Sequence, residues 1–426
     1  LQAPLTQNDR PWDRLAKQYY QKCVDEEDLE ATGVESVQKL LQQLGGWPVL
    51  ESYEWKAWNH SWERQLAHVM NRTGVNAMIL ELAVSHDPLN SSKSIIEIDQ
   101  PKWGVGSRWP YLAGIHDPII QNYTSLMIQT AMNIGADRAN AEYDMRQAIE
   151  FELRLVNFSA DEMTRRDPER SNNRYQLWQL HDVYPHIDLV GYIKTVFDGL
   201  ENVSPNDTII IREPEYFRRM QKVMRRSSKR VIANYMLWRV IQGYSPFLPR
   251  LMREPFYAFK ANQTGMSSIP VPDRYKFSPN LPVILTIVMI DMPVGRMYVE
   301  NYFDQTRAMR KMNDLTKHFK NELIKQLEAV DWMDEGTRKR AILKAEHINY
   351  KSGFPSYLFN ETYMMDNWQL PETSKLEPLL EFTIRIKLVR VAEELMRLKK
   401  PVDRSLWFQG PAQVDAYYAP NLNEMS

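Results

Sequence analysis

The sequence predicts a mainly α-helical fold with a small β-hairpin, and three observations support this prediction. Apolar residues recur at steps of three and four through most of the chain, as they do on the buried face of a helix. Stretches typical of strands are few and short. The chain has 426 residues, of which 43% are hydrophobic and 25% charged, so it is long enough for a large core and two or three domains.

In the first part of the chain, the spacing of apolar residues predicts three helices, over Pro11–Cys23, Val34–Leu44 and Ser61–Asn71. The sequence Gly45-Gly46-Trp47-Pro48 ends the second helix, because glycine permits the conformation found after a helix and proline prevents the helix from resuming.

A β-hairpin is predicted next. Asn76–Val84 and Ser94–Asp99 are rich in aliphatic residues, and the turn-forming stretch Ser85–Asn90 joins them. Asp99-Gln100-Pro101 ends the second strand, since proline cannot donate to a strand ladder.

The helical pattern returns at about Asp117 and continues with few breaks. The apolar run Val283–Ile290 is too short to span a bilayer and predicts a buried strand or a core segment. A Pro/Ser/Asn-rich linker precedes it over Ser267–Pro282. Further helices are predicted over Arg174–His181, Ile187–Asp198, Pro214–Arg225, Lys229–Gly243, Phe247–Ala261 and Met297–Val330.

Near its end the chain changes character. Asp334 is a predicted N-cap for a helix through Ile348, and an apolar stripe from Leu380 to Leu398 predicts one more helix before Pro401. Val414–Tyr418 is β-prone and is followed by a turn containing proline and asparagine.

Composition narrows the functional class. The net charge of −1 gives no bulk attraction to nucleic acid or anionic membrane. The single cysteine, Cys23, excludes a disulfide within the chain and a cysteine-based zinc site. Nine Asn-X-Ser/Thr sequons indicate a glycoprotein of the secretory pathway. They lie at Asn59, Asn71, Asn90, Asn122, Asn157, Asn202, Asn206, Asn262 and Asn360.

The residues alone indicate no complete active site. None of the eight histidines forms an HExxH motif, which would place two imidazoles on one helix face with a glutamate between them. His181 and His186 are the only close pair, and Pro185 between them precludes a regular helical ligand face. The chain also lacks the GxSxG motif and a glycine-rich phosphate loop.

Several short stretches, taken in order, resemble the neprilysin family of zinc metalloendopeptidases, which includes the endothelin-converting enzymes. Each is weakly specific alone, but their order covers nearly the whole chain. They are Tyr19-Tyr20-Gln21-Lys22-Cys23, Gly45-Gly46-Trp47-Pro48, Ile98-Asp99-Gln100-Pro101 with Ser107-Arg108, Arg166-Asp167 with Tyr175, Asn234-Tyr235-Met236-Leu237-Trp238-Arg239, Val294-Gly295-Arg296-Met297-Tyr298-Val299, Trp332-Met333-Asp334 with Thr337 and Ala341, and Val414-Asp415-Ala416-Tyr417-Tyr418.

The resemblance implies two lobes around an enclosed cavity. Residues 1–371 would form the helical lid, and residues 372–426 would begin an incomplete α+β catalytic domain. Zinc is implied for a complete family member, with its HExxH helix beyond Ser426, and no metal ligand or catalytic residue is expected in this chain. The anchoring segment would precede Leu1, which implies an extracellular protein, either secreted or the ectodomain of a single-pass membrane protein.

The resemblance also implies a substrate-binding strand over residues 413–418. Family members carry Asn-Ala-Tyr/Phe-Tyr there, and substrate adds beside it as an antiparallel strand. The match assigns substrate binding to Asp415 and Ala416. Asp415 departs from the family, because a carboxylate accepts from a backbone N–H but does not donate unless protonated. An unpaired substrate carbonyl would cost about 1–3 kcal/mol. The alternative is that Asp415 is an ordinary polar residue at a strand end.

Three hypotheses follow. In the first, the chain is the lid portion of a neprilysin-like enzyme that cleaves small extracellular peptides, with peptide substrates and the catalytic lobe as partners. In the second, it is an inactive pseudopeptidase that binds peptides or proteins. The family's partner cysteines are absent, so Cys23 is either buried or available for an intermolecular bridge. Self-association through Cys23 or an exposed lid surface is also expected. An unrelated helical interaction protein is the third alternative.

Overall fold

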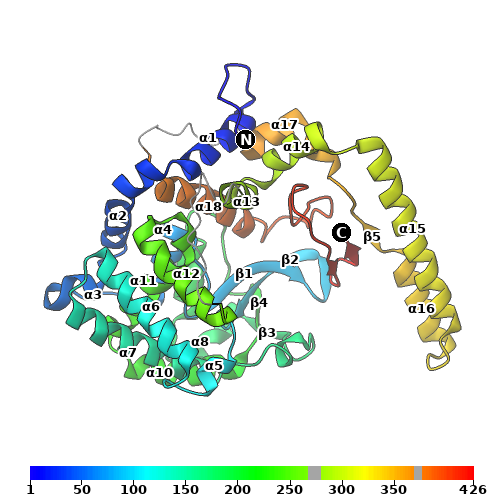
Figure 1. Cartoon of the computed structure of the whole chain (residues 1–426). Helices are drawn as coiled ribbons and strands as arrows, with labels where there is room; N and C mark the ends of the chain where they lie inside the picture. Colours follow the sequence, from blue (N-terminus) through cyan, green and yellow to red (C-terminus); the bar gives the residue numbers. More distant parts are fainter. Residues whose placement is uncertain (267–279, 369–376) are drawn as a thin grey trace.

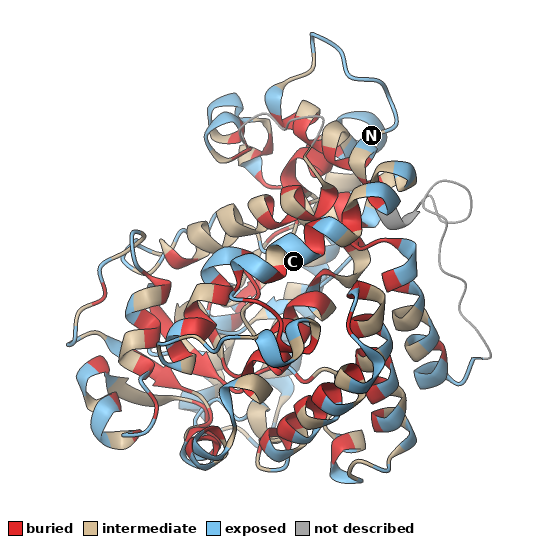
Figure 2. Cartoon of the chain, turned by 90° about the vertical axis from the view of Figure 1, so that its left-hand side faces the viewer, coloured by how far each residue is buried: buried red, intermediate tan, exposed pale blue. Residues whose placement is uncertain are grey.

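The structure, a computed structural model, describes residues 1–266, 280–368 and 377–426. Most helices form one curved body around a four-stranded sheet (Figure 1). A pair of helices, α15 and α16, extends from that body, and the C-terminus lies between the pair and the body. The expected mainly α-helical fold is confirmed. Figure 2 shows the buried residues concentrated in the curved body.

The described helices are numbered in chain order. The first twelve are α1 (Pro11–Val24), α2 (Glu26–Gln43), α3 (Pro48–Glu51), α4 (Trp62–Thr73), α5 (Trp109–Leu112), α6 (Pro118–Ile134), α7 (Arg138–Val156), α8 (Leu180–Val183), α9 (Leu189–Val196), α10 (Pro214–Arg226), α11 (Lys229–Tyr244) and α12 (Arg250–Thr264). The later ones are α13 (Asn280–Met289), α14 (Asp291–Tyr302), α15 (Gln305–Ala329), α16 (Glu335–Glu346), α17 (Glu361–Trp368) and α18 (Leu379–Leu395).

In the described residues, seven strands form two sheets. The larger sheet has the order β1-β2-β4-β3, and the smaller has the order β5-β7-β6. The strands are β1 (Glu81–Asp87), β2 (Asn90–Asp99), β3 (Asn173–Gln176), β4 (Thr208–Ile211), β5 (Asn349–Tyr350), β6 (Tyr418–Ala419) and β7 (Glu424–Met425).

The two faces of the larger sheet differ in polarity. Its register pairs Leu82 with Ile98 and Ile98 with Ile211, so these side chains share one face, which is buried in the core. The opposite face carries charged residues, and Arg212 there lies 3.2 Å from Glu97 and 3.4 Å from Asp99. The sheet therefore buries an apolar face in the core, and its second face combines the buried Ile95 and Ile210 with charged residues.

Helix α11 lies in the centre of the core. Ten of its 16 residues are buried, including Trp238, whose Nε1 donates to the Tyr123 hydroxyl over 2.7 Å. The indole also stacks on Phe256, with a ring separation of 5.9 Å. Apolar residues lie on nearly every side of α11, as is typical of a helix that neighbouring elements bury on all sides.

The first helix is held by the last ones. Helix α1 packs against α13, α14, α17 and α18. The Tyr19 hydroxyl lies 2.9 Å from the Thr383 hydroxyl, although 364 residues separate the two positions. Cys23 is fully buried in this region.

Local signals set several helix ends. The Asp334 carboxylate accepts from the backbone N–H of Thr337 (2.9 Å), which confirms the predicted N-cap of α16. Helix α4 ends at Gly74, whose φ of 65° lies in the left-handed region that favours glycine.

The predicted helix over Arg174–His181 is wrong in its first half. Asn173–Gln176 is strand β3, which pairs antiparallel with β4, a strand that the sequence analysis missed. Helical structure begins only afterwards, with a 3-10 turn and α8. Pairing with β4 supplies hydrogen bonds that local propensity does not foresee.

Three other predicted elements need correction. The single helix over Met297–Val330 is two helices, because α14 ends at Tyr302 and the Asp304 side chain caps α15 through the Arg307 N–H (2.8 Å). Val283–Ile290 lies mostly in helix α13, so the strand alternative was wrong. Both hairpin strands extend further toward the turn than predicted, to Asp87 and from Asn90, and the first strand begins at Glu81 rather than at Asn76.

Two predictions fall partly or wholly outside the described residues. The linker over Ser267–Pro282 is described only from 280 onward. The predicted domain boundary between residues 371 and 372 lies within 369–376, which the structure does not describe.

Candidate functional site

The predicted substrate strand lies at the edge of the small sheet. Strand β7 is in the middle, parallel to β5 and antiparallel to β6. Backbone bonds from Asn349 N–H to Asn423 (2.9 Å) and from Lys351 N–H to Met425 (2.8 Å) join β5 to β7. Figure 1 shows this sheet between the helical body and the α15–α16 pair.

The strand is shorter than the sequence predicts. Its ladder begins at Tyr417, which exchanges both backbone hydrogen bonds with Ser426 at 3.0 Å, and β6 proper starts at Tyr418. Val414, Asp415 and Ala416 are exposed and lie outside the assigned strand. The predicted strand Val414–Tyr418 is therefore divided. Residues 414–416 lie outside the ladder, and Tyr417 and Tyr418 pair with the last residues of the chain.

The free edge of β6 offers backbone groups to solvent. Antiparallel strands point successive residues' N–H and C=O groups to alternate sides. Since those of Tyr417 point to Ser426, those of Ala416 and Tyr418 point away from β7. An extended peptide could pair with this edge, and the groups available to it are the Ala416 carbonyl and both backbone groups of Tyr418.

Asp415 is occupied by contacts within the chain. Its Oδ2 accepts from Gln409 Nε2 (2.9 Å), and its Oδ1 accepts from the backbone N–H of Ala416 (2.8 Å). The bond from Gln409, and then the bond from Ala416, lower the pKa of the Asp415 carboxyl below its usual value. The group is therefore an ionised acceptor that covers the outward N–H of Ala416.

A buried ion pair fixes the small sheet. The Lys351 ammonium donates to Glu424 Oε1 (2.7 Å) and to the Leu406 carbonyl (2.6 Å), and Asn349 Nδ2 donates to Glu424 Oε2 (3.1 Å). The side chains of Lys351 and Glu424 are only 7% and 0% exposed. Because both ends are hydrogen-bonded, the pair holds β5 to β7 and sets the position of β6. No pattern in the sequence predicted this pair.

Aromatic contacts connect the small sheet to the large one. Phe408 lies 5.5 Å from the Tyr417 ring and 6.2 Å from the His86 ring on β1. Burial, and then the nearby Arg397, lower the pKa of His86. This histidine therefore favours its neutral form where the two sheets meet.

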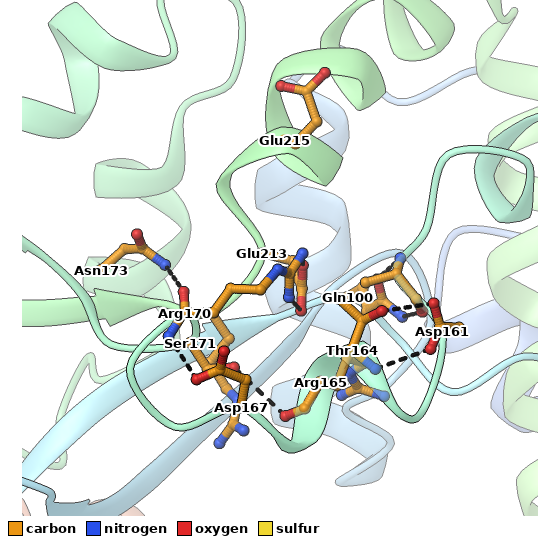
Figure 3. Close-up of polar contacts among 12 residues, drawn as sticks. Gln100, Asp161, Thr164, Arg165, Asp167, Arg170, Ser171, Asn173, Glu213 and Glu215 are labelled. Carbon is orange, nitrogen blue, oxygen red and sulfur yellow. Dashed lines mark hydrogen bonds and ion pairs between the residues drawn. The ribbon is translucent and has the colours of Figure 1, made fainter.

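Hydrogen bonds and an ion pair hold the loop that carries the Arg166-Asp167 motif, as Figure 3 shows. Asp167 Oδ1 accepts from the backbone N–H groups of Glu169 (3.0 Å) and Arg170 (3.2 Å). The Arg170 guanidinium donates to both carboxylate oxygens of Glu213, over 2.7 and 2.6 Å. These bonds shape the loop and tie it to the start of α10.

The histidines do not converge on a metal site. His181 is largely exposed, with Asp182 at 3.9 Å, and His186 lies 3.4 Å from an Arg225 nitrogen. Within residues 1–266, 280–368 and 377–426, no group of three His, Cys, Asp or Glu side chains could hold a metal ion.

All nine predicted sequons are accessible. Asn122 is half-buried and the other eight asparagines are exposed. In the part of the chain that the structure describes, no helix combines the length and the apolar composition needed to cross a membrane.

Comparison with known proteins agrees with the motif order. A model of peptidase family M13 matches residues 1–355. Neprilysin-21 of Caenorhabditis elegans is 60% identical over 425 residues, and human Neprilysin is 26% identical over 442 residues. Both alignments cover 100% of this chain, but only 55% and 58% of those proteins. The chain thus spans little more than half the length of these relatives.

Solved structures show the same fold. The zinc metalloprotease ZMP1 of Mycobacterium tuberculosis, in complex with an inhibitor, matches with a TM-score of 0.77 and 21% identity, covering 96% of this chain and 58% of that one. PEPO from Lactobacillus rhamnosis matches with a TM-score of 0.78 and 16% identity, covering 99% and 62%. With the family match over most of its length and a 60% identical relative, the chain belongs to peptidase family M13, the neprilysin family of zinc metallopeptidases.

Proposed function

We propose that this chain is the peptide-binding lid portion of a neprilysin-like zinc metalloendopeptidase that acts on small extracellular peptides. The helical body restricts access, and the edge of β6 aligns the substrate. Zinc and the general base come from the part of the relatives that this chain does not match. The nine accessible sequons support an extracellular setting, either secreted or as an ectodomain.

The observation that carries the proposal is the free edge of β6. The backbone groups of Tyr418 and the carbonyl of Ala416 face away from β7 and can pair with an extended peptide. The buried Lys351–Glu424 pair keeps this edge in place. The strand is therefore preorganised, so a peptide that binds there orders few additional groups.

One observation favours a second candidate, an inactive protein that binds peptides or proteins without cleaving them. Both oxygens of Asp415 accept hydrogen bonds within the chain, and its carboxylate cannot donate to a substrate carbonyl. Zinc-dependent cleavage of a short peptide by the purified 426-residue chain, abolished by a chelator, would exclude this candidate.

The edge can be tested by peptide binding to the 426-residue chain. The probe is a fluorescein-labelled, acetylated and amidated pentapeptide of alternating valine and threonine, followed by fluorescence anisotropy. We expect Asp415→Asn to tighten binding about tenfold, because the amide supplies the missing donor to a peptide carbonyl. Asp403→Asn is the matched control, since Asp403 is also exposed and caps the nearby backbone N–H of Ser405.

A second substitution tests the pairing itself. Tyr418→Pro removes an outward N–H at a sheet edge, where proline is structurally tolerated. We expect Tyr418→Pro combined with Asp415→Asn to lose the tenfold gain while the melting temperature equals that of Tyr418→Ala. Unaltered binding in both variants would refute β6 as the peptide site.

A further inference from the structure

Helix α10 separates its apolar residues from its charged residues sharply. Its buried side consists of Tyr216, Phe217, Met220, Gln221 and Met224. Its exposed side carries five cations, which we call the α10 basic face: Arg218, Arg219, Lys222, Arg225 and Arg226. In the sequence these cations are spread over two short runs and a single lysine, and the helix brings them all to one side.

The five cations form a continuous row. At about 100° per residue they fall within an arc of roughly 120°, and they extend over about 12 Å along the helix axis. The side chains of Arg218 and Arg219 are 56% and 58% exposed. Lys222, Arg225 and Arg226 are exposed as well. The row is therefore accessible along about two turns of the helix.

One carboxylate on the exposed side of α10 compensates the first part of this row. Glu215 accepts from Arg219 Nε (2.6 Å) and from Arg218 Nη1 (3.3 Å). Glu213, which precedes the helix, accepts from Arg170 instead (2.7 Å). Figure 3 shows that the carboxylates of Glu213 and Glu215 lie apart.

The second part of the row is not compensated. In the described part of the chain, Lys222, Arg225 and Arg226 form no ion pair with a carboxylate. Arg225 Nη1 lies 3.4 Å from His186 Nε2, and an imidazole supplies no negative charge. Three cations therefore face solvent together, although the whole chain has a net charge of only −1.

This arrangement is unfavourable for the helix by itself. Lys222 lies three or four positions from each of the other four cations, and like charges at these spacings repel. On α7, by contrast, Arg138 faces Glu142 four positions later (3.0 Å). The helix dipole favours cations in the last turn, which accounts for Arg225 and Arg226 but not for Lys222. A bound polyanion would remove the repulsion.

The chemistry of the row selects one class of polyanion. Four of its five cations are arginines, whose planar guanidinium groups pair well with the oxygens of sulfate or phosphate groups. Amphipathic helices that bind membranes insert exposed aromatic or aliphatic side chains. The aromatic residues of α10, Tyr216 and Phe217, are buried, so the helix does not offer such side chains. The nine accessible sequons support an extracellular setting, where sulfated polysaccharides are the abundant polyanions.

We propose that the α10 basic face binds a sulfated glycosaminoglycan of the cell surface or extracellular matrix. Clustered Lys and Arg residues on one surface are typical of heparin-binding sites. The proposal shares only the extracellular setting with the proposed function, and it requires neither zinc nor peptide binding at β6. Binding at α10 retains the protein on surfaces that carry these polysaccharides.

The test measures binding of the 426-residue chain to immobilised heparin at an ionic strength of about 0.15 M. One triple variant removes the uncompensated cations of α10: Lys222→Gln, Arg225→Gln and Arg226→Gln. The matched control removes three exposed cations of α16: Lys339→Gln, Arg340→Gln and Lys344→Gln. Both variants lose the same charge, so a difference between them reports on the position of the cations. Hyaluronan, which is unsulfated, and phosphatidylcholine vesicles that contain phosphatidylserine are the comparison ligands.

We expect the α10 triple variant to bind heparin at least about tenfold more weakly than the parent chain, because each cation removed weakens binding to a polyanion severalfold. The α16 control should bind as the parent does. Equal losses in the two variants would overturn the proposal, as would equal binding of the parent to hyaluronan and heparin. Tighter binding to the vesicles than to heparin would also overturn it, because a membrane would then be the ligand.

Two further measurements do not depend on how the triple variant folds. Heparin should raise the melting temperature of the parent chain, because a ligand that binds only the folded state stabilises it. Lys222→Arg retains the charge and should bind heparin as tightly as the parent. No rise in melting temperature, or a loss of binding in Lys222→Arg, would count against the site.

The outcomes also separate this surface from the peptide site. Heparin binding by a chain that does not bind the labelled pentapeptide would support the α10 basic face and refute the proposed function. Pentapeptide binding without heparin binding would overturn the α10 basic face alone.

Discussion

Helices α11 and α15 show two ways in which one chain uses a helix. Ten of 16 residues of α11 are buried, whereas none of the 25 residues of α15 is. Helix α11 is surrounded by its own chain, so its side chains determine the stability of the fold. Helix α15 touches mainly α16, so its side chains are available for another surface. The helical body buries the apolar side chains of α11, whereas the α15–α16 pair leaves apolar side chains such as Phe319 exposed.

The largest expected effect tests the buried side of this comparison. Trp238→Ala should destabilise the chain by about 3–5 kcal/mol, because it leaves a large cavity and removes the donor to Tyr123. Denaturant unfolding followed by circular dichroism measures the change. Phe319→Ala on α15 is the matched control and should stay within about 0.5 kcal/mol. Similar losses in the free energy of unfolding for the two substitutions would contradict the difference between α11 and α15.

An intermediate effect concerns the sheet between the two regions. Lys351→Met leaves the Glu424 carboxylate buried without its cation. We expect the free energy of unfolding to fall by about 3 kcal/mol. This is near the lower end for broken buried ion pairs, because the Asn349 amide still donates to Glu424. Hydrogen exchange should rise first at the Tyr417 and Ser426 amides. Lys339→Met, in an exposed pair with Glu335, is the control and should change exchange nowhere in the sheet.

The smallest effect is a pH dependence at the contact between the two sheets. The folded pKa of His86 lies below its usual value of 6.5, chiefly because of burial and then because of Arg397. As the pH falls through that value, the unfolded chain binds a proton that the folded chain does not, so the free energy of unfolding decreases. His86→Phe keeps a ring beside Phe408 and should reduce the loss of melting temperature between pH 7 and pH 5. An identical slope in both proteins would show that this contact does not titrate.

The helices of the body could be predicted closely because their signals are local. Predicted Pro214–Arg225 became α10 at Pro214–Arg226, and predicted Lys229–Gly243 became α11 at Lys229–Tyr244. The failures involve partners distant in sequence. Strand β3 pairs with β4, a four-residue strand more than 30 positions later, and no local pattern distinguishes that pairing from a helix.

The candidate site shows the same limit. Asp415 and Ala416 could be identified only by resemblance, and their function remains a prediction. The Lys351–Glu424 pair joins positions 73 residues apart, and each residue alone looks like an ordinary surface charge. Gln409 is near Asp415 in sequence, but only the fold of the loop turns its amide toward the carboxylate. Side-chain contacts of this kind leave no pattern in the sequence from which they could be predicted.

The packing of α1 against the last helices has a consequence for synthesis. The partner of Tyr19, Thr383, is made 364 residues later. At about 5–20 residues per second, roughly 20–70 s pass between the two. For most of that interval, until α13 and α14 are made, the first helix lacks the helices that it packs against, and its cover is incomplete until α18 follows. Nascent chains should therefore depend on a chaperone at their N-terminus until α18 has emerged from the ribosome.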